Sequence, residues 1–296
     1  DWTSENKEDM APRMLSVSSV FQGGRVTLPP REWVLGRRYL RKAVTACYGD
    51  PGTGKTAFTL VTAISIATGI SLTGEPVYRP GPAWIINNEE PADELYRRAL
   101  GVCLHYGVDP TSLDGRLHIS SGFDRKTILA GRPTVLKGLG EIKRTKTADA
   151  IVDRCREHGI VWVSLDPLVS MSRNLDENSN GDMEALMSVV RDISDQADIS
   201  VDLVHHTNKA SSGASRGGGM IAGRGASSLS GAARIIYVLA KMDEKTAEDL
   251  QLRDAERRDH FLMDVAKGNY ARAPEAPTWF RHRSVALNNG VDDEDL

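Results

Sequence analysis

The sequence predicts an α/β fold in which helices flank a mainly parallel β-sheet. From Ala43 onward, short apolar runs alternate with amphipathic stretches, the pattern of strand and helix units in a parallel sheet. With 296 residues, the chain can also bury a large hydrophobic core. We expect an irregular arm over residues 1–40, one α/β domain over residues 41–285, and an acidic flexible tail over residues 286–296.

The expected elements follow from the apolar runs and the periodic stretches between them. Three helices are predicted at Lys55–Thr68, Pro91–Tyr106 and Asp182–Ala197, the second with proline at its favoured first position. The candidate strands are Ala43–Tyr48, Ala83–Asn87, Leu117–Ser120, Ile160–Leu165, Val201–His205, Arg234–Ala240 and Phe261–Ala266.

Composition excludes several classes of protein. The formal net charge of −3 argues against a surface that binds nucleic acid indiscriminately, although a local basic groove is compatible with it. Cys47, Cys103 and Cys155 lie far apart without metal-ligand spacing, so neither a disulfide framework nor a zinc site is expected. No apolar stretch approaches the roughly 18 residues of a membrane span. These features predict a cytoplasmic protein that makes no membrane contact.

A phosphate-binding loop is the strongest motif in the chain. The residues GDPGTGKT, from Gly49 to Thr56, match G-x-x-x-x-G-K-[ST] directly after an apolar strand and directly before a helix. Backbone N–H groups of such a loop surround the phosphates of ATP, the lysine neutralises them, and the threonine hydroxyl binds Mg²⁺. The predicted nucleotide-binding residues are Gly49, Asp50, Pro51, Gly52, Thr53, Gly54, Lys55, Thr56 and Ala57.

Carboxylates at the ends of two other strands complete the predicted site. Asp166 ends the apolar run VWVSLD, so we expect it to orient Mg²⁺ together with Thr56. Glu89 and Glu90 follow another strand, and one of them would activate the attacking water. Simpler roles exist, because Asp166 could cap a turn before Pro167 and the glutamates could complement a helix dipole.

Six segments, taken in order, resemble the RecA/DnaB superfamily of motor ATPases, specifically the plasmid RepA-type hexameric helicases. They span roughly residues 29–280 and read PPREW, GDPGTGKT, NNEEP, VSLDP, HHTNK and GRGASSLSGAAR. The resemblance implies a RecA-like P-loop core over residues 41–285. It also implies that Glu89, in preference to Glu90, is the catalytic glutamate and that Asp166 is the Walker B aspartate.

The resemblance implies three further roles. His206 falls at the γ-phosphate sensor position, with His205 as second choice, although a histidine pair at a strand end is often only solvated. Arg234 falls where an arginine reaches the ATP of a neighbouring subunit, Arg224 is its competitor, and a simple salt bridge is the alternative. Lys267 lies where relatives carry a second trans-acting cation, but Asn269 replaces the arginine found there.

Residues 207–228 are rich in glycine, serine and alanine and contain Lys209, Arg216 and Arg224 without an acid. The resemblance places a DNA-contacting loop in this segment, and it has no aromatic residue for base stacking. We expect any binding of single-stranded DNA to be electrostatic and sensitive to salt. A plain flexible loop has the same composition.

The resemblance therefore implies a homo-oligomeric motor, a hexameric ring that couples ATP hydrolysis to movement on single-stranded DNA in replication. The alternative within the fold is a RecA/KaiC-like regulatory or recombination ATPase that assembles on DNA without unwinding it. A small-molecule P-loop kinase would need an arginine-rich substrate lid, where this chain has glycine and serine. A non-catalytic interaction module would not need the complete set of hydrolysis residues.

Overall fold

The computed structural model describes residues 28–133, 140–206 and 231–290. The chain packs as two units, residues 1–31 and residues 32–296. Only residues 28–31 of the first unit are described, so the following account concerns the second. Residues 33–40, which the sequence assigns to the arm, form a buried hairpin of β1 (Trp33–Leu35) and β2 (Tyr39–Leu40) in the second unit.

The main sheet has eight strands within the described residues, in the order β13-β12-β11-β3-β10-β8-β4-β5. The six strands from β11 to β5 are parallel, and β12 and β13 continue the sheet in antiparallel pairing. This arrangement confirms the predicted α/β fold. The eight strands of the main sheet are β3 (Val44–Gly49), β4 (Ala83–Asn87), β5 (Leu117–Ser121), β8 (Trp162–Asp166), β10 (Ser200–His206), β11 (Ile235–Lys241), β12 (His260–Gly268) and β13 (Thr278–Arg281).

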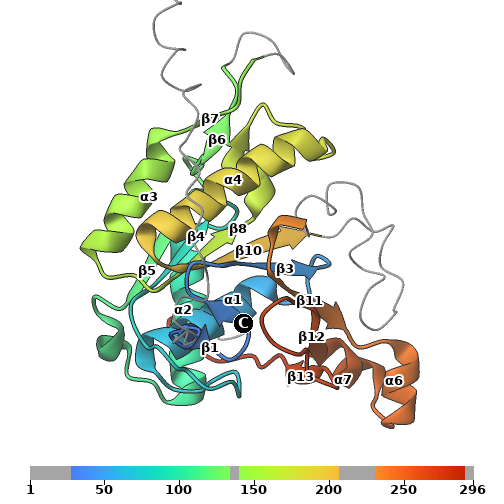
Figure 1. The fold of residues 1–296 in the computed structure, drawn as a ribbon. Helices are drawn as coiled ribbons and strands as arrows, with labels where there is room; N and C mark the ends of the chain where they lie inside the picture. Colours follow the sequence, from blue (N-terminus) through green and yellow to red (C-terminus); the bar gives the residue numbers. More distant parts are fainter. Residues whose placement is uncertain (1–27, 134–139, 207–230, 291–296) are drawn as a thin grey trace, which may run out of the picture. The chain divides into compact units, whose positions relative to one another are not determined.

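Helices cover both faces of this sheet (Figure 1). One hydrophobic cluster joins the sheet to α3 and α4, and another joins it to α1 and α2. The helices are α1 (Lys55–Thr68), α2 (Ala92–Tyr106), α3 (Lys146–Glu157), α4 (Asn180–Ala197), α6 (Glu244–Asp249) and α7 (Asp254–Asp259), with 3₁₀ turns η1 (Pro110–Leu113) and η2 (Leu168–Met171). A small sheet contains β6 (Ala130–Gly131), β7 (Lys143–Arg144) and β9 (Ser172–Arg173).

The helix ends follow local sequence rules. The α1 helix ends at Gly69, a left-handed glycine whose N–H donates to the carbonyl of Ser65, and the Ser179 side chain accepts from the N–H of Asp182 at the start of α4. The sequence predicted Pro91 as the first residue of its helix, whereas in the structure Pro91 is the N-cap and α2 begins one residue later, at Ala92. The predicted ranges of all three helices otherwise agree with the structure to within two residues.

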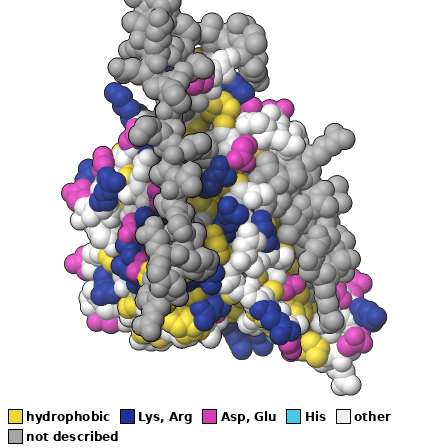
Figure 2. Space-filling view, in the orientation of Figure 1, with side chains coloured by type: hydrophobic (Ala, Val, Ile, Leu, Met, Phe, Trp, Pro, Cys, Tyr) yellow, Lys and Arg dark blue, Asp and Glu magenta, His cyan; other side chains and the backbone are white. Residues whose placement is uncertain are grey.

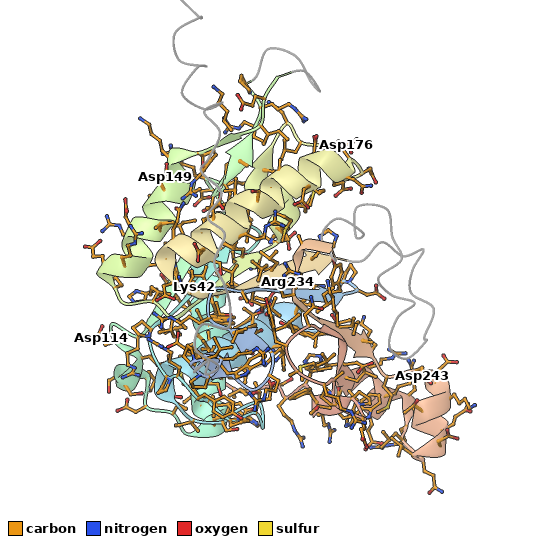
Figure 3. The ribbon with its side chains drawn as sticks, in the orientation of Figure 1. Lys42, Asp114, Asp149, Asp176, Arg234 and Asp243 are labelled. Atoms are coloured by element: carbon orange, nitrogen blue, oxygen red, sulfur yellow. The ribbon has the colours of Figure 1, made fainter. Side chains whose placement is uncertain are left out.

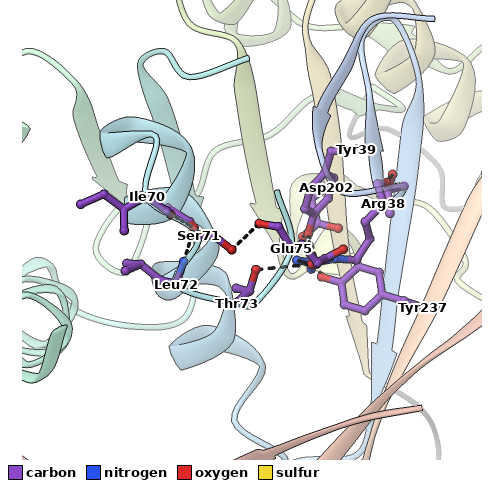
Figure 4. A network of polar contacts seen from close by, with 11 residues as sticks. Arg38, Tyr39, Ile70, Ser71, Leu72, Thr73, Glu75, Asp202 and Tyr237 are labelled. Carbon is purple, nitrogen blue, oxygen red and sulfur yellow. Dashed lines mark hydrogen bonds and ion pairs between the residues drawn. The ribbon is translucent and has the colours of Figure 1, made fainter. Parts of the chain in front are cut away.

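A buried polar network lies between the sheet and α1 (Figure 4). The Arg38 guanidinium, only 1% exposed, donates to the Glu75 carboxylate at 2.9 Å from Nε. The hydroxyls of Tyr39 and Tyr237 each donate to Oδ2 of Asp202 at 2.9 Å. Buried polar groups persist when they are paired in this way, so the network fixes β2, β10 and β11 against one another.

The described surface carries both signs of charge. Figure 2 shows acidic and basic side chains interspersed on one face of the molecule, in keeping with the small net charge of −3. None of the described helices combines the length and the apolar character needed to cross a membrane.

Candidate functional site

The predicted phosphate loop lies at the carboxyl edge of the parallel strands. It leaves β3 at Gly49, which pairs with His206 of β10 on one side and with Leu239 of β11 on the other, and it enters α1 at Lys55. Gly52 and Gly54 have φ angles of 72° and 83°, which L side chains rarely adopt. The Gly residues of the motif thus permit a bend that presents backbone amides at the start of α1, a geometry suited to anions.

Lys55 folds back over its own loop. Its Nζ donates to the carbonyl oxygens of Gly49 at 2.8 Å and Asp50 at 2.9 Å. Burial lowers the pKa of Lys55, while the charges of Asp166 and Asp50 act in the opposite direction. A partly desolvated ammonium held at the centre of the loop gains most from an added anion, because Coulomb attraction is strong where water is excluded.

Asp166 reaches the loop from β8. Its Oδ2 accepts from Oγ1 of Thr56 at 3.4 Å and from Nδ2 of Asn87 at 3.0 Å. The side chain is only 2% exposed, and burial, reinforced by the charge of Glu89, raises its pKa to about 7. Thr56 and Asp166, far apart in the sequence, therefore lie within hydrogen-bonding distance of each other.

Asn87 organises the two glutamates that follow β4. Its Oδ1 accepts from the backbone N–H groups of both Glu89 and Glu90, each at 2.8 Å. The Glu90 carboxylate is bound by Arg98 at 2.9 Å, whereas Glu89 is exposed and its charge raises the pKa of Asp166 more than that of Glu90 does. This arrangement favours Glu89 over Glu90 as the base. No role was predicted for Asn87 from the sequence, although a polar side chain at the end of an apolar strand, just before the two glutamates, could have indicated a residue of the site.

The comparison with protein families agrees with this geometry. A family model described as an AAA domain matches residues 11–212, about two thirds of the chain, and this range includes the loop, Glu89 and Asp166. The chain belongs to this family of P-loop ATPases. A search of the curated proteins gives no match.

The AAA domain offers a donor set suited to Mg²⁺. The Thr56 hydroxyl and the Asp166 carboxylate are oxygen donors on adjoining elements, and Mg²⁺ is bound in proteins by one or two such groups together with water and phosphate. A buried carboxylate with a raised pKa lacks sufficient compensating charge. A divalent cation at Thr56 and Asp166 would supply that charge.

The structure brings only some of the other predicted residues to this site. His206 is the last residue of β10 and pairs with Gly49, which places its backbone beside the loop. The ring of His205 packs edge-on against Tyr48, with centroids 5.5 Å apart. The predicted DNA loop with Lys209, Arg216 and Arg224 lies outside the described residues.

Arg234 lies elsewhere, just before β11 (Figure 3). Its N–H donates to the carbonyl of Val44 at 3.1 Å, at the opposite end of β3 from Gly49. Six residues of strand separate the two edges of the sheet by roughly 17 Å. Lys267 is beside it, donating to the carbonyl of Ala233 at 2.8 Å. Neither cation belongs to the nucleotide site of its own chain.

A cavity of about 690 Å³ lies away from the predicted site. It runs along the open edge of β5, between α2 and α3, and its lining includes Trp84, Leu100 and His118. None of the predicted site residues lines it. The phosphate loop of the AAA domain lies instead at the carboxyl edge of the sheet, where only Pro51 and Gly52 are exposed, and successive backbone amides in such a turn form a concave anion-binding site.

Proposed function

We propose that this ATPase is a ring-forming motor that couples hydrolysis of ATP to movement along single-stranded DNA, as in RepA-type replicative helicases. The single observation that carries the proposal is the division of its polar residues between two edges of one sheet. Lys55, Thr56, Asp166 and Glu89 gather at the carboxyl edge, whereas Arg234 is exposed near the amino edge.

The geometry at the carboxyl edge supports the following division of roles. Lys55 and the loop amides would bind the phosphates, and Thr56 with Asp166 would hold Mg²⁺, which would supply positive charge to the phosphates during hydrolysis. Glu89 orients and deprotonates the attacking water. Asn87 holds the Asp166 carboxylate and the Glu89 backbone in a fixed relation through its two hydrogen-bonding groups.

The position of Arg234 supports assembly. Its guanidinium forms no ion pair with another described residue, and it cannot reach the phosphate loop of its own chain. An arginine supplied by a neighbouring subunit stabilises the charge that develops during phosphoryl transfer. Hydrolysis would then depend on formation of the ring, and we propose a hexamer that binds single-stranded DNA through residues 207–228.

The proposal is tested by ATPase turnover with and without single-stranded DNA, together with oligomeric state measured by light scattering. We expect turnover that DNA stimulates, loss of turnover in Lys55→Ala, and parental turnover in Lys146→Ala, which removes an exposed lysine from α3. Mixing Arg234→Ala with Lys55→Ala subunits should restore some activity, because each chain retains one half of a shared site.

A strictly monomeric protein whose turnover ignores single-stranded DNA would contradict the motor function. ATP-dependent assembly on DNA without displacement of a paired strand would instead support the RecA/KaiC-like regulatory or recombination ATPase. A helicase assay with a forked duplex separates these two results.

A further inference from the structure

Two basic side chains reach the phosphate loop from the C-terminal strands. The β11 strand runs parallel to β3, so Lys241 at its end lies at the same sheet edge as the loop. The β13 strand is antiparallel to β12, which is antiparallel to β11, and its carboxyl end therefore also lies at this edge. His282 follows β13 directly.

Both side chains contact the glycines of the loop. A Cβ atom on Gly54 would collide with the imidazole ring of His282, and a Cβ atom on Gly52 would lie 3.3 Å from Nζ of Lys241. These two glycines are therefore constrained by close approach as well as by their positive φ angles. The matched family segment ends at residue 212, so it contains neither Lys241 nor His282.

The His282 ring is held in a fixed orientation. It stacks on Phe261 with centroids 4.7 Å apart and 26° between the planes, and its backbone N–H donates to the carbonyl of Asp259 at 2.7 Å. Burial lowers the pKa of His282; the charges of Lys241 and His260 act in the same direction, and Asp259 opposes them. The carboxylate of Asp259 is itself bound by Arg281 at 3.3 Å.

Neither side chain forms an ion pair within the described part of the chain. Lys241 is an exposed ammonium and His282 a half-buried imidazole, and each can donate a hydrogen bond to an oxygen of a ligand at the loop. The acids lie on the other side of the loop, Asp166 on β8 and Glu89 after β4. The loop thus lies between the two acids on one side and the donors Lys241 and His282 on the other.

This asymmetry sets the direction of a bound nucleotide. Thr56 and Asp166 mark the metal-binding end, where the terminal phosphates must lie. The rest of the nucleotide then extends across Gly52 and Gly54 toward β11 and β13. We propose that Lys241 and His282 bind the α-phosphate and ribose of this same nucleotide, which makes the β12–β13 hairpin part of the site.

The proposal rests on the ATP-binding role of the loop and is tested by the dissociation constant of ADP, measured by calorimetry on the full chain. Lys241→Met keeps the aliphatic stem, and His282→Phe keeps a ring that can stack on Phe261. We expect each to weaken ADP binding by about tenfold, the effect of one charge-assisted contact. Lys245→Met and His105→Phe, two exposed positions, are matched controls and should bind as the parent does.

The outcomes separate the failure of this proposal from that of the proposed function. ADP affinity unchanged in both variants, with binding lost in Lys55→Ala, would overturn the role of Lys241 and His282 alone. A parent that binds no ADP would refute the nucleotide site itself. If His282→Phe lowers the unfolding temperature, His282→Leu removes the ring nitrogens in a smaller side chain, and parental ADP affinity in a folded His282→Leu would exclude His282 from the site.

Discussion

Asp166 and Asp202 are buried aspartates on neighbouring strands, and their surroundings differ in one respect. Asp202 lies inside the sheet, level with Thr45, and two tyrosine hydroxyls donate to its Oδ2. Asp166 lies at the carboxyl edge beside Thr56 and Lys55, with Glu89 adding negative charge. Burial raises the pKa of both, to about 6 for Asp202 and about 7 for Asp166.

The comparison shows that a raised pKa alone does not identify a catalytic carboxylate. Arg38, Tyr39 and Tyr237 compensate Asp202 from within the protein, so its charge serves the packing of three strands. The negative charge of Asp166 is balanced by fewer neighbouring donors, and its carboxylate lies next to the phosphate loop. Stability and function should consequently respond in opposite ways when the two residues are changed.

The largest expected effect is on ATP hydrolysis. Asp166→Asn removes the charge that we propose holds Mg²⁺ and should lower kcat by roughly a hundred- to a thousandfold. Asp202→Asn keeps an oxygen acceptor for the tyrosines and lies away from the loop, so its turnover should remain close to that of the parent. Steady-state kinetics at a temperature where all three proteins are folded make this comparison, and equal losses in both variants would contradict the division of roles.

The second effect is on stability: Asp166→Asn should lower activity but make the folded protein more stable. Its pKa of about 7 exceeds the ordinary value of 3.8, so its contribution to stability is complete below about pH 4 and is lost as pH rises to 7. Without nucleotide at pH 8, Asp166→Asn should therefore raise the free energy of unfolding, by up to roughly 4 kcal/mol. Thermal unfolding from pH 8 to pH 4 should show this gain shrinking, and a gain independent of pH would rule out the buried charge of Asp166 as its cause.

Asp202→Ala should do the reverse and destabilise the fold. The buried hydroxyls of Tyr39 and Tyr237 lose their acceptor, which should lower the free energy of unfolding by roughly 2–4 kcal/mol. Asp153→Ala, on the exposed side of α3, is the matched control and should change it by less than about 0.5 kcal/mol. Urea unfolding measures both, and an unchanged stability in Asp202→Ala would show that the network is dispensable.

Sequence alone predicted the elements built from local patterns. The helices that follow Gly54 and Pro91 are in place, as are seven strands, because apolar periodicity and turn chemistry act within a few residues. The phosphate loop was equally predictable, since its glycines and Lys55 are contiguous. The helices, the strands and the loop all depend on interactions between residues that are close in the sequence.

Residues that meet over long sequence distances were not predictable. Tyr39 and Asp202 are 163 positions apart, and the Arg38 network gives no local signal. The β13 strand, with only one partly buried residue, lacks an apolar run, and His282 follows it. The buried hairpin β1–β2 was assigned to the arm because its strands are so short. Only the paired sheet brings such residues together.

The smallest expected effect is that of Asn87, which positions the two carboxylates of the site without being proposed to bind ATP itself. Asn87→Ala deletes the donor to Asp166 and the acceptor for the Glu89 and Glu90 amides, while the residues that touch ATP all remain. We expect kcat to fall about tenfold, with Mg²⁺ required at higher concentration because Asp166 is less firmly held. Asn88→Ala is the matched control, since its side chain bonds to Thr127 and Ser170 instead. If kcat falls while the Mg²⁺ requirement is unchanged, Asn87 acts by positioning Glu89 and its hydrogen bond to Asp166 does not affect metal binding.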